Sequence, residues 1–132
     1  MNLPQPGVTK ILIVGADRPT CDVLSQVLAG SRFQLLIAAN EREALLQFST
    51  SRPDLIILDM NSWDSLPRIH EMCSVPIIAL GRPDDPEAAV ESLDHGADYF
   101  LTKPFGNQEL CARIRALLRR KKSQVSTLVP LS

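Results

Sequence analysis

Short apolar runs alternate with segments of helical periodicity along this chain, and the alternation limits the folds open to it. The runs are rich in β-branched or large apolar residues, as strands are, and they lie at 10–14, 33–38, 54–59, 75–80 and 98–101. The run DLIILD (54–59) is apolar on both faces, which is typical of a parallel strand covered by helices. The helical segments lie at 19–29, 41–49, 66–73, 86–95 and 107–121. This order predicts an α/β domain with a parallel sheet and helices on both faces.

Polar residues mark the ends of the predicted helices. Asn40 and Asp85 stand directly before helical segments, where their side chains can cap the first turn. Pro86 suits the first turn itself, because that position needs no backbone donor. After the basic end of the last helix, residues 123–132 are expected to be a tail or linker stub. We therefore expect one folded domain over 1–122.

Composition argues against several classes of function. The chain has 132 residues, with 14 Lys+Arg against 15 Asp+Glu, so we expect no direct nucleic-acid binding by this domain. Its apolar runs are shorter than the roughly 18 residues that a membrane span needs, so no membrane association is expected. The three cysteines are widely spaced and form no CxxC motif, which favours free thiols in the cytoplasm over disulfides or zinc ligands.

Chemically active residues gather at the predicted carboxyl ends of the strands, where ligands bind in such sheets. Asp17, Asp59 and Lys103 follow the first, third and fifth strands. A carboxylate beside a lysine can be a nucleophile towards a phosphoryl donor, with the lysine pairing the phosphoryl oxygens. The alternative is a structural ion pair, which generic chemistry alone favours because such pairs are common.

The second half of the chain carries a specific resemblance. VPIIAL followed by HGADYFLTKPFGNQELCARIRALLRR resembles the receiver domains of response regulators, above all the subfamily with winged-helix DNA-binding domains. KILIV and DLIILDM fit the same template, so the resemblance covers about residues 9–121. It implies a flavodoxin-like (βα)5 fold with strand order 2-1-3-4-5. It also implies a non-enzymatic, cytoplasmic signalling domain of a two-component phosphorelay, whose partner is a histidine kinase.

The resemblance assigns roles to individual residues. Asp59 matches the phosphoacceptor, and Lys103 matches the lysine that pairs with it and then with a phosphoryl oxygen. The family's bond between this lysine and the next proline is usually cis, so the same is expected of the Lys103–Pro104 bond. Phe100 matches the switch aromatic. The backbone carbonyl of Asn61 matches a magnesium ligand.

The same rim departs from the family pattern. The two acidic residues that hold magnesium in the family are Gly15 and Ala16 here, and Asp17 is only a weak substitute. Because magnesium prefers carboxylate and water oxygens, we expect weak or no Mg²⁺ binding. The switch hydroxyl is replaced by Gly81, although Arg82 next to it could offer donors instead. The loop at 60–67 is short and contains Trp63, either a local anchor or a partner contact.

A surface of opposite charges is also implied by the resemblance. In the winged-helix subfamily the fourth helix, fifth strand and fifth helix form a two-fold dimer face. The matching charged residues here are Glu91, Asp94, Asp98, Arg113, Arg115 and Arg120. The acidic residue that normally follows Asp98 is Tyr99, so one pair is missing. A solvated charged helix is the alternative.

Three functions remain in view. The leading one is a receiver that is phosphorylated on Asp59 and signals through this face, with a possible C-terminal DNA-binding effector domain outside this chain. The second is a phosphorylation-independent pseudo-receiver that acts in dimerisation or docking, favoured by Gly15, Ala16 and Gly81. A flavodoxin-like enzyme is disfavoured, because no phosphate-binding loop follows the first strand.

Overall fold

A single parallel sheet forms the centre of the molecule. The computed structural model describes residues 8–29, 32–59 and 64–128, with side chains up to residue 120. The five strands lie in the order β2-β1-β3-β4-β5, and neighbouring strands are parallel throughout. Their bounds are β1 Thr9–Val14, β2 Phe33–Ala38, β3 Leu55–Asp59, β4 Ile77–Gly81 and β5 Tyr99–Thr102. The strand order expected of a receiver-like fold is therefore confirmed.

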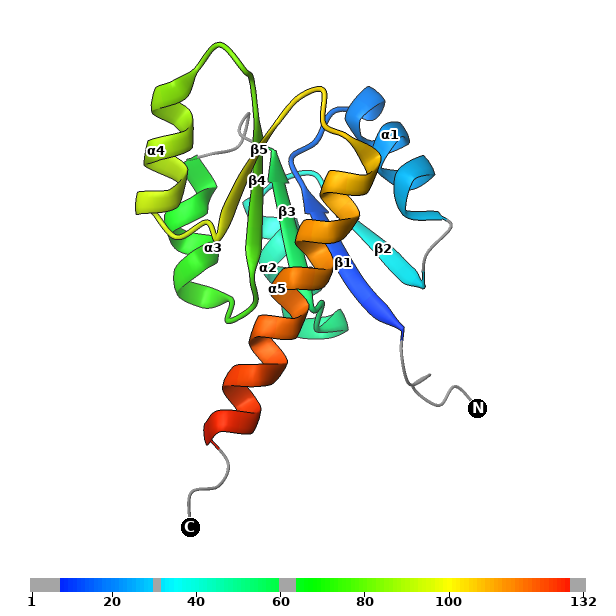
Figure 1. The fold of residues 1–132 in the computed structure, drawn as a ribbon, viewed down its shortest axis with the longest axis vertical. Helices are drawn as coiled ribbons and strands as arrows, with labels where there is room; N and C mark the ends of the chain where they lie inside the picture. Colours follow the sequence, from blue (N-terminus) through cyan, green and yellow to red (C-terminus); the bar gives the residue numbers. More distant parts are fainter. Residues whose placement is uncertain (1–7, 30–31, 60–63, 129–132) are drawn as a thin grey trace.

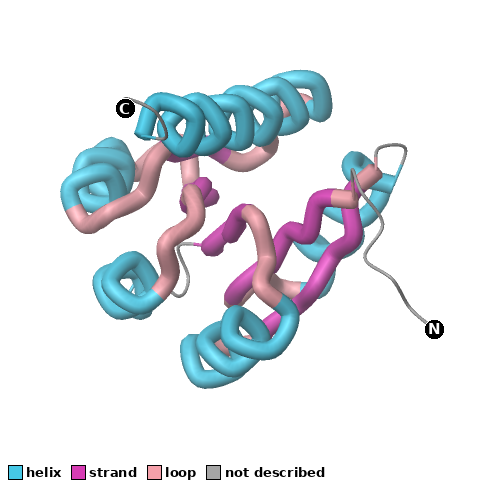
Figure 2. Tube along the Cα trace, turned by 90° about the horizontal axis from the view of Figure 1, so that it is seen from below, coloured by secondary structure: helices cyan, strands magenta, loops and turns pink. Residues whose placement is uncertain are grey.

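Helices cover both faces of this sheet, as Figure 1 and the end-on view of Figure 2 show. Their bounds are α1 Arg18–Ala29, α2 Glu41–Ser51, α3 Leu66–Met72, α4 Pro86–Asp94 and α5 Asn107–Leu128. Apolar residues of α1 and α5 share one core cluster with the sheet, and those of α2 and α3 share the other. All residues of β3 and β4 are buried, which explains why these strands are apolar on both faces.

The predicted caps form where the sequence placed them. The Asn40 side chain accepts a hydrogen bond from the Glu43 amide at 2.9 Å, and the Glu43 carboxylate accepts one from the Ala39 amide. This reciprocal arrangement satisfies donors that the first turn of a helix leaves unpaired. Asp85 caps α4 in the same way, accepting from the Ala88 amide. The beginnings of α2 and α4 are thus fixed by local chemistry.

The end of the last helix differs from the prediction. We expected it to end near 121, but α5 continues to Leu128, so the first residues of the expected tail are helical. No proline or glycine interrupts the chain between Asn107 and Leu128, and a helix continues until something stops it. Figure 1 shows that this last part of α5 extends past the sheet. No helix in the described ranges is long and apolar enough to cross a bilayer.

Candidate functional site

Asp59 lies at the carboxyl end of β3 and makes the central contact of the candidate site. Its side chain is only 1% exposed, and its Oδ2 lies 2.5 Å from Nζ of Lys103. Lys103 follows β5 directly, and its backbone amide donates to the Gly81 carbonyl at 2.8 Å. That bond holds the lysine backbone against the end of β4. A buried carboxylate therefore meets a partly buried ammonium, where their attraction is stronger than in water.

The Lys103–Pro104 peptide bond is cis, as the resemblance implied. Gly81 and Thr102 are register partners at the ends of β4 and β5. Phe100 is half-buried and packs against the core cluster on the α2 and α3 side of the sheet. Arg82, which follows Gly81, is exposed, and its guanidinium pairs with Asp84 at 3.3 Å.

Asp17 has a structural task at the start of α1. Its Oδ1 accepts a hydrogen bond from the Thr20 amide at 2.9 Å, and its backbone carbonyl accepts from the Cys21 amide. Hydrogen bonds from Thr20 lower the pKa of this carboxyl, with a smaller contribution from the positive charge of Lys103. Asp17 therefore lies near the rim but serves as a helix cap.

Comparison with known proteins identifies the family. The family model described as "Response regulator receiver domain" matches residues 11–115. The chain belongs to this receiver domain family. Receiver domains of response regulators are generally signalling domains and not enzymes. The resemblance stated on the TKPF segment is thus confirmed.

Several curated relatives are response regulators by name. The chain is 37% identical to the response regulator MprA of Mycolicibacterium vanbaalenii over 84% of its length and 51% of the relative's. It is 33% identical to the DNA-binding response regulator MtrA of Mycobacterium tuberculosis, covering 93% of the chain and 56% of MtrA. The chain spans about half the length of these relatives.

Solved structures agree with the fold. A two-component response regulator from Clostridium difficile superimposes with a TM-score of 0.77 at 28% identity, covering 86% of this chain and 98% of the other. A receiver-modulated diguanylate cyclase from Pelobacter carbinolicus gives 0.74 at 33% identity, covering 89% and 98%. Both support the receiver architecture described above.

The described residues at the carboxyl ends of the strands do not fit the magnesium ion that receiver domains usually bind. Gly15 and Ala16 offer no side-chain oxygen at the end of β1, and Asp17 is engaged at the helix terminus. The described ranges contain no group of three or more His, Cys, Asp or Glu side chains that could hold a metal. Asn61, whose carbonyl was expected to be a ligand, lies outside the described residues, as does Trp63.

The charged residues expected on the dimer face of the receiver domain are exposed, but two of them already have intramolecular contacts. Oδ2 of Asp98 accepts from the Ile77 amide at 2.8 Å. The guanidinium of Arg113 lies 4.1 Å from the centre of the Tyr99 ring, an arrangement that attracts a cation to the face of the ring. Glu91 and Asp94 of α4 and Arg115 and Arg120 of α5 are exposed.

Sequence reasoning missed Cys21 as a rim residue. It had been assigned only as a free thiol, but Sγ lies 3.7 Å from the Ala16 carbonyl oxygen. Burial raises the pKa of this thiol, and the negative charges of Asp17, Asp22 and Asp59 raise it further. The thiol is therefore kept in its neutral form. Cys21 lies four residues after Asp17, on the first turn of the predicted helix. That position could have predicted that its thiol lies near the carboxyl end of the first strand.

Proposed function

We propose that this receiver domain accepts a phosphoryl group on Asp59 from a histidine kinase and signals through α4, β5 and α5. The observation that carries the proposal is the contact between Asp59 and Lys103 at the carboxyl end of β3. A lysine ammonium that neutralises the carboxylate before the reaction can pair with phosphoryl oxygens after it.

The transfer itself needs few protein groups. A carboxylate oxygen of Asp59 attacks phosphorus, the O–P bond forms, and the N–P bond of the kinase phosphohistidine breaks. The electron pair of that bond stays on the imidazole nitrogen, which then takes a proton from solvent. Lys103 moves from the carboxylate to the new phosphoryl oxygens and offsets their charge. Because the described residues do not fit magnesium, Lys103 is the group that supplies positive charge to the phosphoryl oxygens.

A phosphorylation-independent pseudo-receiver is the second candidate. Gly15 and Ala16 remove the acidic pair of the family, and Gly81 removes the hydroxyl that would meet the phosphoryl group. The preformed ion pair between Asp59 and Lys103 then has a purely structural role, and the domain acts through its surface alone.

One mass measurement separates these candidates. The purified domain is incubated with acetyl phosphate, with and without Mg²⁺, and its intact mass is compared with those of two variants. Asp59→Asn removes the proposed acceptor, and Asp94→Asn removes an exposed carboxylate of α4 as a matched control. One phosphoryl adduct on the wild type and on Asp94→Asn, absent from Asp59→Asn, supports phosphoacceptance. A folded wild type without adduct in either condition supports the pseudo-receiver.

We further propose that the domain is cytoplasmic, forms a two-fold dimer through α4, β5 and α5, and belongs to a protein with a DNA-binding effector domain. MtrA is a DNA-binding response regulator about twice as long as this chain. The exposed apolar residues Val90 and Leu93 of α4, at 60% and 48% exposure, support a contact there. Glu91 and Asp94 beside them can pair with arginines of a second copy.

A further inference from the structure

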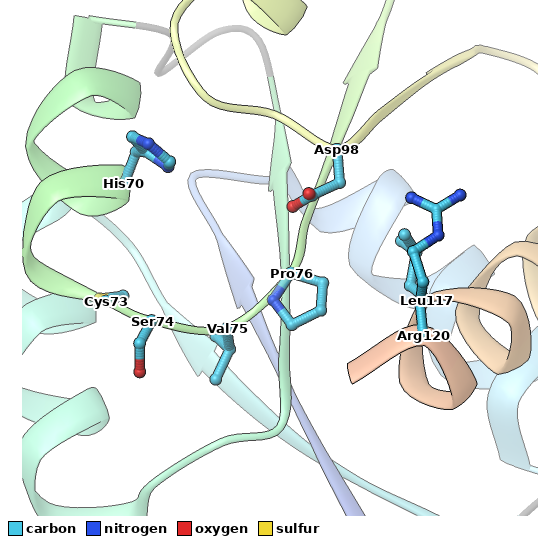
Figure 3. Close-up of a pocket in the computed structure, with 8 residues that line it drawn as sticks. All are labelled: His70, Cys73, Ser74, Val75, Pro76, Asp98, Leu117 and Arg120. Carbon is cyan, nitrogen blue, oxygen red and sulfur yellow. The ribbon is translucent and has the colours of Figure 1, made fainter. Parts of the chain in front are cut away.

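A cavity of about 300 Å³ lies at the edge of the sheet opposite Asp59, where β4 and β5 begin (Figure 3). Its apolar lining includes Val75, Pro76 and Leu117, and its polar lining includes His70, Asp98 and Arg120. These residues come from α3, from the segments that enter β4 and β5, and from α5. None of them has a role in the proposed phosphorylation.

Two of the polar groups are held in place by the fold. Oδ2 of Asp98 accepts from the Ile77 amide at 2.8 Å, and the Asp98 amide donates back to the Ile77 carbonyl at 2.7 Å. Oδ1 of Asp98 has no hydrogen-bond partner among the residues that the structure describes. The imidazole of His70 packs so closely on Gly96 that a Cβ at position 96 would overlap it. Asp98 and His70 are therefore positioned before any ligand arrives.

The charges around the cavity are complementary but not paired with each other. No ion pair within the described ranges joins Asp98 to Arg120, although both line the same cavity. Figure 3 places Asp98 between His70, on the α3 side, and Arg120, on the α5 side. An arginine fork binds carboxylates with two parallel hydrogen bonds, and the remaining oxygen of Asp98 can accept from a cationic nitrogen.

We propose that this cavity binds a small zwitterion with an apolar body, of the chemical class of the aliphatic α-amino acids. The ligand ammonium donates to Oδ1 of Asp98, and the ligand carboxylate accepts from the Arg120 guanidinium. The aliphatic side chain packs on Val75, Pro76 and Leu117. The volume lies at the lower end of the range for small-molecule sites, so it suits a ligand of this size. Because Asp98 and Arg120 also belong to the proposed dimer face, a bound ligand competes with their use there.

An amide-shift titration tests the proposal. The ¹⁵N-labelled domain is titrated with L-leucine, and the amides of Ile77 and Asp98 are followed. Two analogues each remove one charge: 4-methylpentanoate lacks the ammonium, and 3-methylbutylamine lacks the carboxylate. We expect saturable shifts with leucine at millimolar concentrations, and at least about tenfold weaker binding of either analogue.

Variants locate the site. Arg120→Gln and Asp98→Asn should each weaken leucine binding at least about tenfold, whereas Arg119→Gln, which changes an exposed arginine of α5 outside both the cavity and the proposed dimer face, should leave it unchanged. Asn at 98 keeps an acceptor for the Ile77 amide, and Arg120 is exposed, so both variants should fold. The proposal is overturned by the absence of saturable shifts up to about 10 mM leucine. It is equally overturned by analogues that bind as well as leucine, or by an equal loss in Arg119→Gln.

Discussion

At the scale of single residues, the contact between Asp59 and Lys103 joins a buried carboxylate to a partly buried ammonium, so we expect it to affect both stability and the proposed phosphorylation. Asp59 is almost fully buried and the Lys103 side chain is 27% exposed, so the carboxylate depends on the lysine more than the lysine depends on it. Removing one partner of a buried ion pair leaves the other charge uncompensated in a poorly solvating environment. Any phosphorylation of Asp59 must also separate this contact.

Replacement of Lys103 tests that dependence. Lys103→Met should lower the free energy of unfolding by about 3 kcal/mol, because it leaves the Asp59 carboxylate buried without its cation. The double variant Asp59→Asn/Lys103→Met should recover most of the loss, since no buried charge remains. Urea denaturation of the single and double variants measures both effects. Equal loss in the two variants would show that the lysine acts by packing and not by charge.

The helix cap at Asp17 gives a pH-dependent contribution to stability. Its pKa is lowered in the folded state by the hydrogen bonds with Thr20, so the stabilisation is fully present above the unfolded pKa. It is lost as the pH falls below the ordinary aspartate pKa and through the lowered pKa of the folded state. The Tm values of the wild type and Asp17→Asn, measured by thermal melts at pH 3 to 7, should therefore converge at the acid end. A constant difference in Tm over that range would contradict this account.

At the scale of elements, α3 closely approaches the turn between α4 and β5, where His70 lies against Gly96. Gly96 has a φ of 119°, a conformation that only glycine adopts without strain. The imidazole of His70 occupies the space that a side chain at 96 would need. The contact between the His70 ring and Gly96 thus helps to position α3.

Substitution of Gly96 should therefore be costly for two separable reasons. Gly96→Ala should lower the free energy of unfolding by about 2 to 4 kcal/mol, combining backbone strain and overlap with His70. His70→Ala in the same chain should recover only the part due to overlap. Denaturation midpoints of the two single variants and the double variant form a cycle that measures the coupling. Purely additive effects would mean that His70 moves away without cost.

The features that the sequence could predict are those fixed by local interactions or by the ends of the strands. Asn40 and Asp85 mark helix starts because the cap and the amide that it accepts from lie three residues apart. The rim pair at Asp59 and Lys103 follows from the rule that parallel strands end at one edge. The end of α5 escaped prediction, because the basic residues near 119–122 are not a stop signal and no proline or glycine occurs before Leu128. The cavity with Asp98 and Arg120 escaped it too, because tertiary packing alone brings these two residues together.

At the scale of the whole molecule, charge is distributed unevenly although its sum is close to zero. Exposed acidic residues lie on α4 and exposed arginines on α5, so two copies related by a two-fold axis can place unlike charges opposite one another. Within the monomer, Asp98 already accepts a hydrogen bond from the Ile77 amide, and Arg113 already contacts the Tyr99 ring. We therefore expect apolar contacts of Val90 and Leu93 to contribute a larger share of the association free energy.

Dimerisation should respond accordingly to salt and to mutation. Arg113→Glu should weaken self-association at least about tenfold, because it creates like charges against α4 and removes the stack on Tyr99. Raising the salt from about 0.1 to 1 M should weaken wild-type association only in part, since apolar contacts are not screened. Sedimentation velocity measures both, with Arg68→Glu on α3 as the control. A wild type that stays monomeric at the highest concentration would remove the dimer model.

The length of α5 has a mechanical consequence. Among the residues of α5 whose side chains are described, Leu117 is the last buried one. The helix continues past the sheet to Leu128, about 16 Å further along its axis (Figure 1). We expect such a segment to amplify a change in the tilt of the helix into a larger displacement at its end. A tilt of α5 by about 10° at the sheet would displace its far end, at Leu128, by about 3 Å. A small change in the packing under α5 would therefore become a larger displacement at Leu128.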